Sequence, residues 1–563
     1  MASFTEKKRE YPGQIREMLR VSASQFADKP AILAKTGGEY RAYTYRRLQS
    51  DVKALGTALA AKGLCGKKLA LLGENGYEWV LILLAALCGD FVAVPIDKAL
   101  PPMDVAQLCQ YAEASAVFYA DGYPESVMAL GENTEAYPFS SIEALLEEGR
   151  RLQTAGEGSF PAARDADAPA LLLFSQAKTD APRDTLLSDK NLCFTATRAA
   201  AAMGLGGKDT LLSLLPLHYA YELTLGLLAP LAAGATVAFG DGLQAIMKNL
   251  GEVHPTALVT TPILAEALWR KAQKMLEAGY GKLGAAEVKA SGILPKRLAL
   301  SLRKKLFGEI HAAFGGSLRL VLCGGAPVSR QVIKGLSDVG ILALTCYTAG
   351  EGAMTVTINA KNAPRAGSVG RALDGAIVDI YNPGEDGKGE IRVKGDGVML
   401  GYYKNEAATA EVIRDGWLYT GDLGALDKDG YLSLTGRKNN LLVRASGQNV
   451  FPEELEPLLA EQPFVKEAVV VGFVNEQKRD YDLVAVIYPD KERFAELYGA
   501  NYTVADEETE VTNAIEKVNA TLPDYKKLDC FVLRQTPFEK TASRKIRRSG
   551  VAGSVKDEYL RKR

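Results

Sequence analysis

Apolar runs typical of strands and of helices alternate along most of the chain, and this alternation constrains the fold more than any other feature. Residues 67–75, KKLALLGEN, predict a buried strand, and residues 76–90, GYEWVLILLAALCGD, predict a helix. Residues 91–96, FVAVPI, predict a second strand. A strand, a helix and a strand at this spacing form a βαβ unit with parallel strands.

The same pattern recurs farther along the chain. It predicts strands in ASAVFYA, TLLSLLPL, ATVAFG, TALVTTP and LRLVLCGG, and helices in ILAEALWRKAQKML and SRQVIKGLSDVG. A helix is also expected after Thr44, a suitable cap, because apolar residues recur at helical spacing from Leu48 to Leu59. Ligands bind beside the carboxyl ends of strands in open α/β sheets, so the turns after Leu322 and Thr345 are candidate walls of a site.

The pattern changes at about Gly367, where short strands with Gly and Asp turns predict a β-rich subdomain. Residues 147–170 predict a surface loop or linker. The 563 residues are too many for one ordinary core. We therefore predict an α/β protein with a large N-terminal domain, residues 1–436, of parallel-type sheets and helices plus the β-rich subdomain. A small α+β domain, residues 437–563, follows it.

Composition excludes several classes of function. The net charge of -1 gives no basic field for nucleic acid or an anionic membrane. The seven cysteines are scattered without a CxxC pair, and the three histidines lie far apart, so neither a disulfide framework nor a zinc site is indicated.

The N-terminal residues lack the apolar stretch of a signal peptide. The longest apolar run, WVLILLAALCG from Trp79, is too short to span a bilayer. We therefore expect a cytoplasmic protein with no integral membrane segment.

Residues 401–456 contain two motifs in a fixed order, TGD and then GRKNN…GQNVFPEELE. In this combination the chain resembles the adenylate-forming superfamily of acyl-CoA synthetases, adenylation domains and luciferases. It is most similar to AMP-forming medium- or long-chain fatty acyl-CoA synthetases. The resemblance implies a mobile C-terminal lid domain, ATP, Mg²⁺ and CoA as cofactors, and a small carboxylate substrate.

The resemblance assigns nucleotide binding to one residue of each motif. Asp422 would accept hydrogen bonds from the ribose hydroxyls, and Arg437 would bind ribose or phosphate oxygens with its planar guanidinium. Asn439 occupies the hinge position, where Lys or Asp is usual, and Gly447 would border the tunnel for the thiol. Without the family context, Asp422 is equally a turn former, Arg437 a solvated charge and Gly447 a plain turn.

Two further motifs resemble the adenine site. In VLCGGAPVS, Gly324, Gly325 and Ala326 would let the backbone approach a flat base. In CYTAGEGAMT, Tyr347 would stack on adenine. In the same motif Glu351 would bind Mg²⁺, which prefers oxygen ligands.

The family's phosphate-binding threonine is Gly350 here, and Thr348 or Thr355 could replace its hydroxyl.

Two residues would act on the acyl group. In LPLHYAYELT, His218 would line or gate the pocket for the carboxylate; its alternative is a satisfied core histidine. In FEKTASRKIRR, Lys545 would polarise the carboxylate and the α-phosphate, because a mobile ammonium places charge where charge develops. A solvated surface lysine is its alternative.

The segment FSQAKTDAPRDTLLSDKNL, residues 174–192, aligns without a gap to the family's phosphate loop. Ser175 and Thr179 keep their hydroxyls, and Arg183 replaces the usual lysine. All three glycines are replaced, by residues that include Asp180 and Asp184. These two carboxylates oppose a polyphosphate unless Mg²⁺ or nearby cations offset them.

The resemblance implies a ligase that converts a carboxylate, such as a fatty acid, to acyl-AMP with ATP and transfers the acyl group to CoA. Two alternatives stay open. The glycine-free loop is also compatible with a homologue that binds AMP or acyl-adenylate in a regulatory role and adenylates weakly. The acceptor could instead be the phosphopantetheine of a carrier protein, which ends in the same thiol as CoA.

Overall fold

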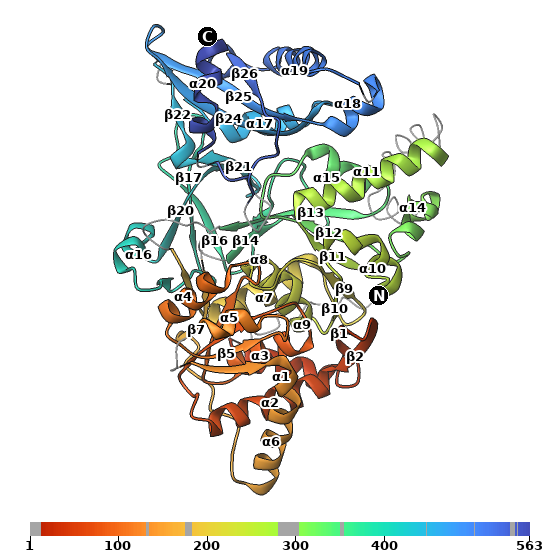
Figure 1. Ribbon diagram of the computed structural model, residues 1–563, viewed down its shortest axis with the longest axis vertical. Coiled ribbons are helices and arrows are strands. Elements are labelled where there is room, and N and C mark those ends of the chain that lie inside the picture. Colours follow the sequence, from red (N-terminus) through yellow and green to blue (C-terminus); the bar gives the residue numbers. More distant parts are fainter. Residues whose placement is uncertain are drawn as a thin grey trace. The chain divides into compact units, whose positions relative to one another are not determined.

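The computed structural model describes residues 13–130, 134–174, 183–279, 303–349, 354–445, 448–499, 501–540, 546–548 and 550–562 (Figure 1). The chain divides into two compact units. The first unit comprises Met1–Gly325, Val332–Val378 and Val393–Thr420. The second unit comprises Ala326–Gln331, Asp379–Arg392 and Gly421–Arg563.

A seven-stranded sheet in the first unit has the order β18-β8-β7-β4-β3-β5-β6. Its strands are β3 (Lys68–Leu72), β4 (Val92–Ile96), β5 (Ala114–Tyr119), β6 (Glu135–Pro138), β7 (Pro169–Leu173), β8 (Thr185–Ser188) and β18 (Gly401–Tyr402). Strands β3 and β4 are parallel, joined by helix α3 (Tyr77–Cys88). The predicted βαβ unit is therefore confirmed.

A nine-stranded sheet in the same unit has the order β15-β14-β13-β12-β11-β9-β10-β1-β2. Its strands are β1 (Pro30–Thr36), β2 (Glu39–Thr44), β9 (Thr210–Ser213), β10 (Thr236–Phe239), β11 (Ala257–Thr260), β12 (Leu320–Cys323), β13 (Leu342–Ala349), β14 (Met354–Ile358) and β15 (Arg371–Ala372). Strands β9 to β13 pair in parallel. Their carboxyl ends therefore lie at one edge, where ligands bind in such sheets.

Helices cover both large sheets in the first unit. They are α1 (Ile15–Gln25), α2 (Tyr45–Ala61), α4 (Pro102–Ala112), α5 (Pro124–Met128), α6 (Ile142–Ala155), α7 (Asp189–Met203), α8 (Ala220–Glu222), α9 (Ala229–Ala232), α10 (Ile246–Val253), α11 (Pro262–Gly279), α14 (Gly308–Ala313), α15 (Arg330–Asp338) and α16 (Glu406–Val412), of which α15 begins in the second unit. The predicted cap of α2 is confirmed, because the Thr44 hydroxyl accepts a hydrogen bond from the Arg47 amide at 3.2 Å.

The prediction of a loop or linker at residues 147–170 is wrong in its first part. Those residues complete helix α6, which lies beside α2 (Figure 1). The helix was not predicted because charged and small residues separate the buried apolar residues of α6, which include Leu145 and Leu152. The extended part that follows is fixed by Arg164, whose guanidinium donates to the carbonyl oxygens of Pro169 at 3.0 Å and Gly89 at 2.9 Å.

The predicted β-rich region contains a five-stranded sheet whose residues are divided between the two units. Its strands are β16 (Ile377–Tyr381), β17 (Gly389–Lys394), β19 (Ile413–Arg414), β20 (Trp417–Leu426) and β21 (Leu432–Arg437). Strands β22 (Leu442–Val443) and β23 (Asn449–Val450) form a separate pair.

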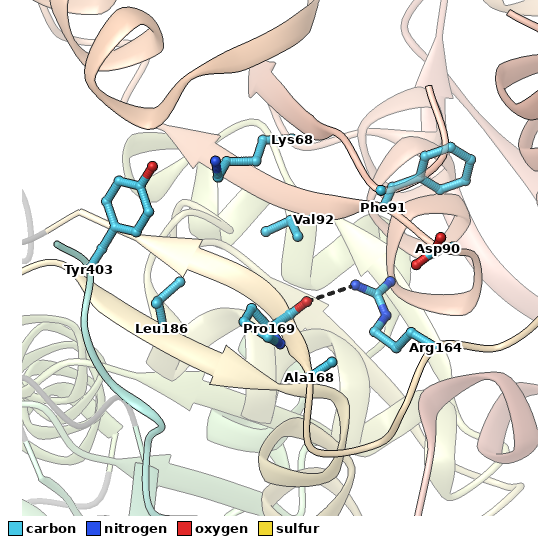
Figure 2. Close-up of a pocket in the computed structure, with 10 residues that line it drawn as sticks. Lys68, Asp90, Phe91, Val92, Arg164, Ala168, Pro169, Leu186 and Tyr403 are labelled. Atoms are coloured by element: carbon cyan, nitrogen blue, oxygen red, sulfur yellow. Dashed lines mark hydrogen bonds between the residues drawn. The ribbon is translucent and has the colours of Figure 1, made fainter. Parts of the chain in front are cut away.

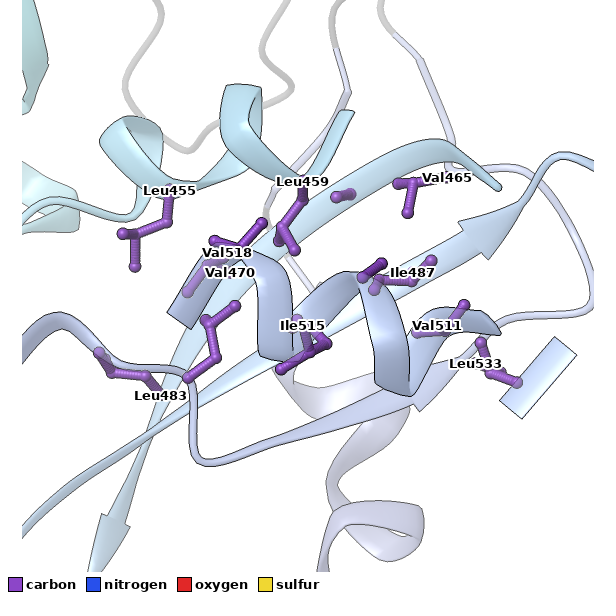
Figure 3. Packing of buried hydrophobic residues seen from close by; sticks show 14 of the residues in the cluster. Leu455, Leu459, Val465, Val470, Leu483, Ile487, Val511, Ile515, Val518 and Leu533 are labelled. Carbon is purple, nitrogen blue, oxygen red and sulfur yellow. The ribbon is translucent and has the colours of Figure 1, made fainter. Parts of the chain in front are cut away.

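The second unit has its own α+β core. Its sheet consists of β24 (Val465–Asn475), β25 (Asp480–Pro489) and β26 (Cys530–Leu533), and its helices are α17 (Pro452–Ala460), α18 (Lys491–Tyr498), α19 (Val504–Asn519) and α20 (Val551–Lys562). Neighbouring residues of β24 point to opposite faces. Val470 packs with α17 and α19 (Figure 3), whereas Val469 packs with α20.

In the described part of the chain, no helix combines the length and apolar character needed to cross a bilayer.

The contact between α2 and α6 yields a stability prediction. A Cβ on Gly149 would lie 1.9 Å from the carbonyl oxygen of Ala54, so even a methyl group forces the helices apart. We expect Gly149→Ala to lower the free energy of unfolding by about 1–3 kcal/mol, measured as a lower melting temperature.

Gly251 provides the matched control, because it also lies within a helix but a Cβ there would meet nothing within 4 Å. Gly251→Ala should raise the free energy of unfolding by up to about 1 kcal/mol through helix propensity alone. Equal melting temperatures for the two variants would contradict the packing argument.

Candidate active site

The two glycines after β12 serve different purposes. A Cβ on Gly324 would lie 2.4 Å from Cys346 Sγ and 2.9 Å from Cε2 of Tyr221, so packing alone excludes a side chain. Gly325 has φ +83° and open space where a Cβ would point. Gly325 therefore fits the predicted close approach of a flat ligand, whereas Gly324 has a packing reason that the motif does not reveal. Ala326 follows directly and is assigned to the second unit.

Tyr347 lies on β13 and is 5% exposed. It pairs with Thr357 on the antiparallel strand β14, next to a shift in the register of the two strands. At this shift the hydroxyls of Thr348 and Thr355 lie 3.2 Å apart. Thr355 is fully buried, which leaves Thr348 as the better candidate to replace the hydroxyl lost at Gly350.

His218 follows β9 and reaches the carboxyl end of the other large sheet. Its Nε2 lies 3.6 Å from Oδ2 of Asp97, the residue after β4. Burial lowers the pKa of His218 to about 4, although the charge of Asp97 acts in the opposite direction. The imidazole is therefore neutral at pH 7, and its Nε2 has no hydrogen-bond partner among the described residues.

The turn that carries His218 is held by Asn75, which the sequence analysis missed. The Asn75 amide group donates to the Leu215 carbonyl at 2.8 Å and accepts from the Leu217 amide at 3.1 Å. Asn75 lies just beyond the carboxyl end of β3. Its position after a predicted strand was the signal in the sequence that could have indicated a role for Asn75. The hydrogen bond itself joins residues 140 apart, so no local pattern reveals it.

Asp422 and Arg437, two predicted nucleotide ligands, are brought together in the second unit. They are directly opposite on β20 and β21, and Arg437 Nε donates to Asp422 Oδ1 at 3.0 Å. Asp422 is 9% exposed, whereas more than half of the Arg437 side chain is exposed. Gly421, with φ +69°, precedes Asp422 within β20. Asn439 lies in the short 3₁₀ turn η4 (Lys438–Asn440) that follows.

The end of the predicted phosphate loop is anchored to β18. The Tyr403 amide donates to the Asp184 carbonyl at 2.7 Å, and the Arg183 guanidinium lies 5.9 Å from the ring centre of Tyr402. The Asp184 side chain is only 4% exposed. Burial, with the charge of Asp184 as the second cause, raises the pKa of Tyr111. Asp184 is therefore directed at least partly toward the protein interior.

Some predicted site residues lie outside the described residues: Ser175, Thr179, Gly350, Glu351, Gly447 and Lys545. Within the described ranges, no group of three or more His, Cys, Asp or Glu could hold a metal ion.

A cavity of about 280 Å³ lies in the first unit (Figure 2). Its lining includes Lys68, Val92 and Pro169, the first residues of β3, β4 and β7. Asn75 and Asp97 follow the opposite ends of β3 and β4. This cavity is therefore not the site at the carboxyl ends of the strands.

Comparison with known families identifies both parts of the chain. The family described as AMP-binding enzyme matches residues 19–403. The AMP-binding enzyme C-terminal domain matches residues 439–558.

Individual proteins agree with this assignment. The long-chain-fatty-acid–CoA ligase FadD15 of Mycobacterium bovis is 27% identical over 555 residues, covering 92% of this chain and 91% of its own. The anthranilate CoA ligase AuaEII in complex with anthranoyl-AMP aligns with a TM-score of 0.77 and 18% identity, over 97% of this chain and 98% of its own. ATP-bound MatB from Rhodopseudomonas palustris aligns with a TM-score of 0.74 and 22% identity, over 96% and 99%.

The structural likenesses confirm the predicted fold, an α/β adenylate-forming fold with a large N-terminal and a small C-terminal domain. The family match extends over more than half of the sequence. The chain therefore belongs to the AMP-binding enzymes, the family of AMP-forming acid–CoA ligases.

Proposed function

We propose that this protein uses ATP to convert a fatty acid to its acyl-adenylate and then transfers the acyl group to the thiol of CoA. The observation that carries the proposal is the ion pair of Asp422 and Arg437 across β20 and β21. A buried carboxylate beside an exposed guanidinium offers acceptors for ribose hydroxyls and donors for phosphate oxygens. The fatty acid rests on the similarity to FadD15.

The residues of the first unit suit the acid substrate. His218 is neutral, and a neutral imidazole can line the pocket for the reacting carboxylate without adding charge. Gly325 fits adenine, because its Cβ position is open. Tyr347 would supply the aromatic face of the same subsite.

The remaining roles fall on residues outside the described ranges. Lys545 would polarise the carboxylate and the α-phosphate, and Ser175 and Thr179 would bind phosphate oxygens with Arg183. Glu351 would hold Mg²⁺, which supplies positive charge against the phosphates. Gly447 would border the path of CoA.

We propose further that residues 437–563 move as a lid between the two half-reactions. Asn439 would be the hinge, because it lies in the η4 turn directly after β21. Lid rotation would replace Lys545 with the thiol at the acyl-adenylate.

A second function is favoured by one observation, the loss of every glycine in the phosphate loop together with the loss of a hydroxyl at Gly350. In this alternative the protein binds AMP or acyl-adenylate but adenylates poorly. The acceptor could also be the phosphopantetheine of a carrier protein. Incubating the protein with CoA and with such a carrier, and measuring which one becomes acylated, distinguishes the two.

The first prediction concerns the adenylation step. ATP–pyrophosphate exchange should depend on a fatty acid in a panel of carboxylates, and Lys545→Ala should lower the exchange rate about a hundredfold or more, because charge stabilisation is lost in the transition state. Lys556→Ala, an exposed lysine of α20, serves as the control and should exchange normally. Absence of exchange with every acid, together with binding of AMP, would instead support the second function.

The second prediction concerns the charge of the phosphate loop. Asp180→Gly should tighten ATP binding by about fivefold, since removing a like charge near the phosphates is worth about 1 kcal/mol at high effective dielectric. Asp184→Gly should change ATP affinity less and lower the melting temperature, because the Asp184 side chain is buried.

Calorimetric titration of ATP into both variants measures this difference. Unchanged or weaker binding by Asp180→Gly would show that Asp180 does not oppose ATP.

A further inference from the structure

The turn between β9 and α8 is supported at its middle and at its start by polar side chains. Asn75 holds its middle through Leu215 and Leu217. At its start, the Ser213 hydroxyl donates to Oε1 of Glu222 at 2.6 Å. Glu222 is fully buried and also interacts with the backbone amide of Leu214. Glu222 therefore ties the beginning of the turn to the helix that follows it.

The helix is shaped to receive this carboxyl group. A Cβ on Gly226 would lie 2.4 Å from both Cδ and Oε1 of Glu222, so only glycine leaves room for it. The wide π-helical turn η2 (Leu223–Leu228) begins directly after Glu222. Such turns are rare and are frequently found at functional sites.

Glu222 is in its acid form at neutral pH. Burial raises its pKa to about 8, and the hydrogen bonds from Ser213 and Leu214 only partly offset this. Its Oε2 has no partner among the described residues. An unpartnered hydroxyl is far less costly in an apolar interior than an unpartnered charge.

The surrounding elements bring no counter-charge to Glu222. Strands β9, β11 and β14 carry no ionisable residue. On α7, Asp189 accepts from the Ile15 amide, Lys190 pairs with Asp167 and Asp396, and Arg198 pairs with Asp374. Glu222 interacts electrostatically with Tyr221, whose hydroxyl contacts the Cys346 thiol, and burial raises the pKa of both of these groups.

We propose that Glu222 is a positioning residue whose carboxyl group, in its acid form, fixes the turn that presents His218 to the carboxylate substrate. The catalytic consequence rests on the proposed function of His218. The position of the turn itself does not, because it follows from the contacts of Ser213, Leu214 and Glu222.

The test compares Glu222→Ala with the isosteric Glu222→Gln in ATP–pyrophosphate exchange. Glu222→Ala should raise KM for the acid about tenfold or more, since small misplacement of a substrate-positioning group is costly. Its KM for ATP should change little. Glu222→Gln should restore the wild-type KM, because glutamine keeps the acceptor oxygen and stays neutral.

The dependence of the exchange rate on pH distinguishes wild-type Glu222, which can ionise, from Glu222→Gln, which cannot. Wild-type exchange should fall as pH rises through about 8, where Glu222 ionises without a partner. Glu222→Gln should not show this fall. Protonated Glu222 contributes its full stabilisation of the folded state below pH 4.5, the ordinary pKa of a glutamate. This stabilisation is lost as pH rises to about 8, the pKa of Glu222 in the folded protein. The melting temperature of the wild type should therefore fall across this window relative to that of Glu222→Gln.

Glu507 provides the matched control, because it is another buried glutamate whose Oε2 is unpartnered among the described residues, on α19 of the second unit. Glu507→Ala should lower the melting temperature and leave the KM for the acid unchanged. The positioning role would be overturned if Glu222→Ala and Glu507→Ala lowered the melting temperature equally and neither variant changed the KM for the acid.

Nuclear magnetic resonance of the three histidines tests the inference without enzyme activity. The His218 resonances should titrate near pH 8 in the wild type, far from the pKa of His218 itself, and should not do so in Glu222→Gln. If no acid supports exchange but this titration is seen, the proposed function fails and the positioning inference stands. If exchange occurs and the titration is absent, the positioning inference fails alone.

Discussion

Parallel pairing of the strands in the first unit is the constraint on which the rest of the structure depends. Parallel neighbours require crossover connections, and their carboxyl ends gather at one edge: those of β3 and β4 in one sheet and of β9 and β12 in the other. Loops at these ends carry Asn75, Asp97 and His218. Because Asn75 of one sheet holds the turn that follows β9 of the other, the two sheets are coupled at the point where the acid substrate is proposed to bind.

The predicted site residues of the first unit differ in electrostatic character from those of the second. In the first unit, burial keeps His218 uncharged and Glu222 protonated at pH 7, and the Asp97 carboxylate lies beside His218. In the second unit, Asp422 and Arg437 form an ion pair that is partly exposed to water. Two uncharged side chains suit the apolar part of an acid, whereas the ion pair suits the polar ribose and phosphates. All four side chains, His218, Glu222, Asp422 and Arg437, are ionisable, so the difference between the uncharged pair and the ion pair comes from the burial of the first two.

Local patterns were sufficient for most of the fold, because strand and helix periods and the cap at Thr44 depend on neighbours in the sequence. They failed at α6, where charged residues and Gly149 concealed a buried stripe. In the site, motif order predicted that Asp422 and Arg437 both serve the nucleotide, but not that they face each other across β20 and β21. It did not reveal that Gly324 is required by Cys346 and Tyr221. Asn75 and Glu222 were not predicted, because their importance lies in contacts formed only after distant segments pack.

The contact between Glu222 and Gly226 also limits how the sequence can vary. A Cβ on Gly226 would lie 2.4 Å from Cδ of Glu222, the residue just before the π-helical turn η2. A larger residue at position 226 therefore requires a smaller side chain at position 222, so the two positions can change only as a pair.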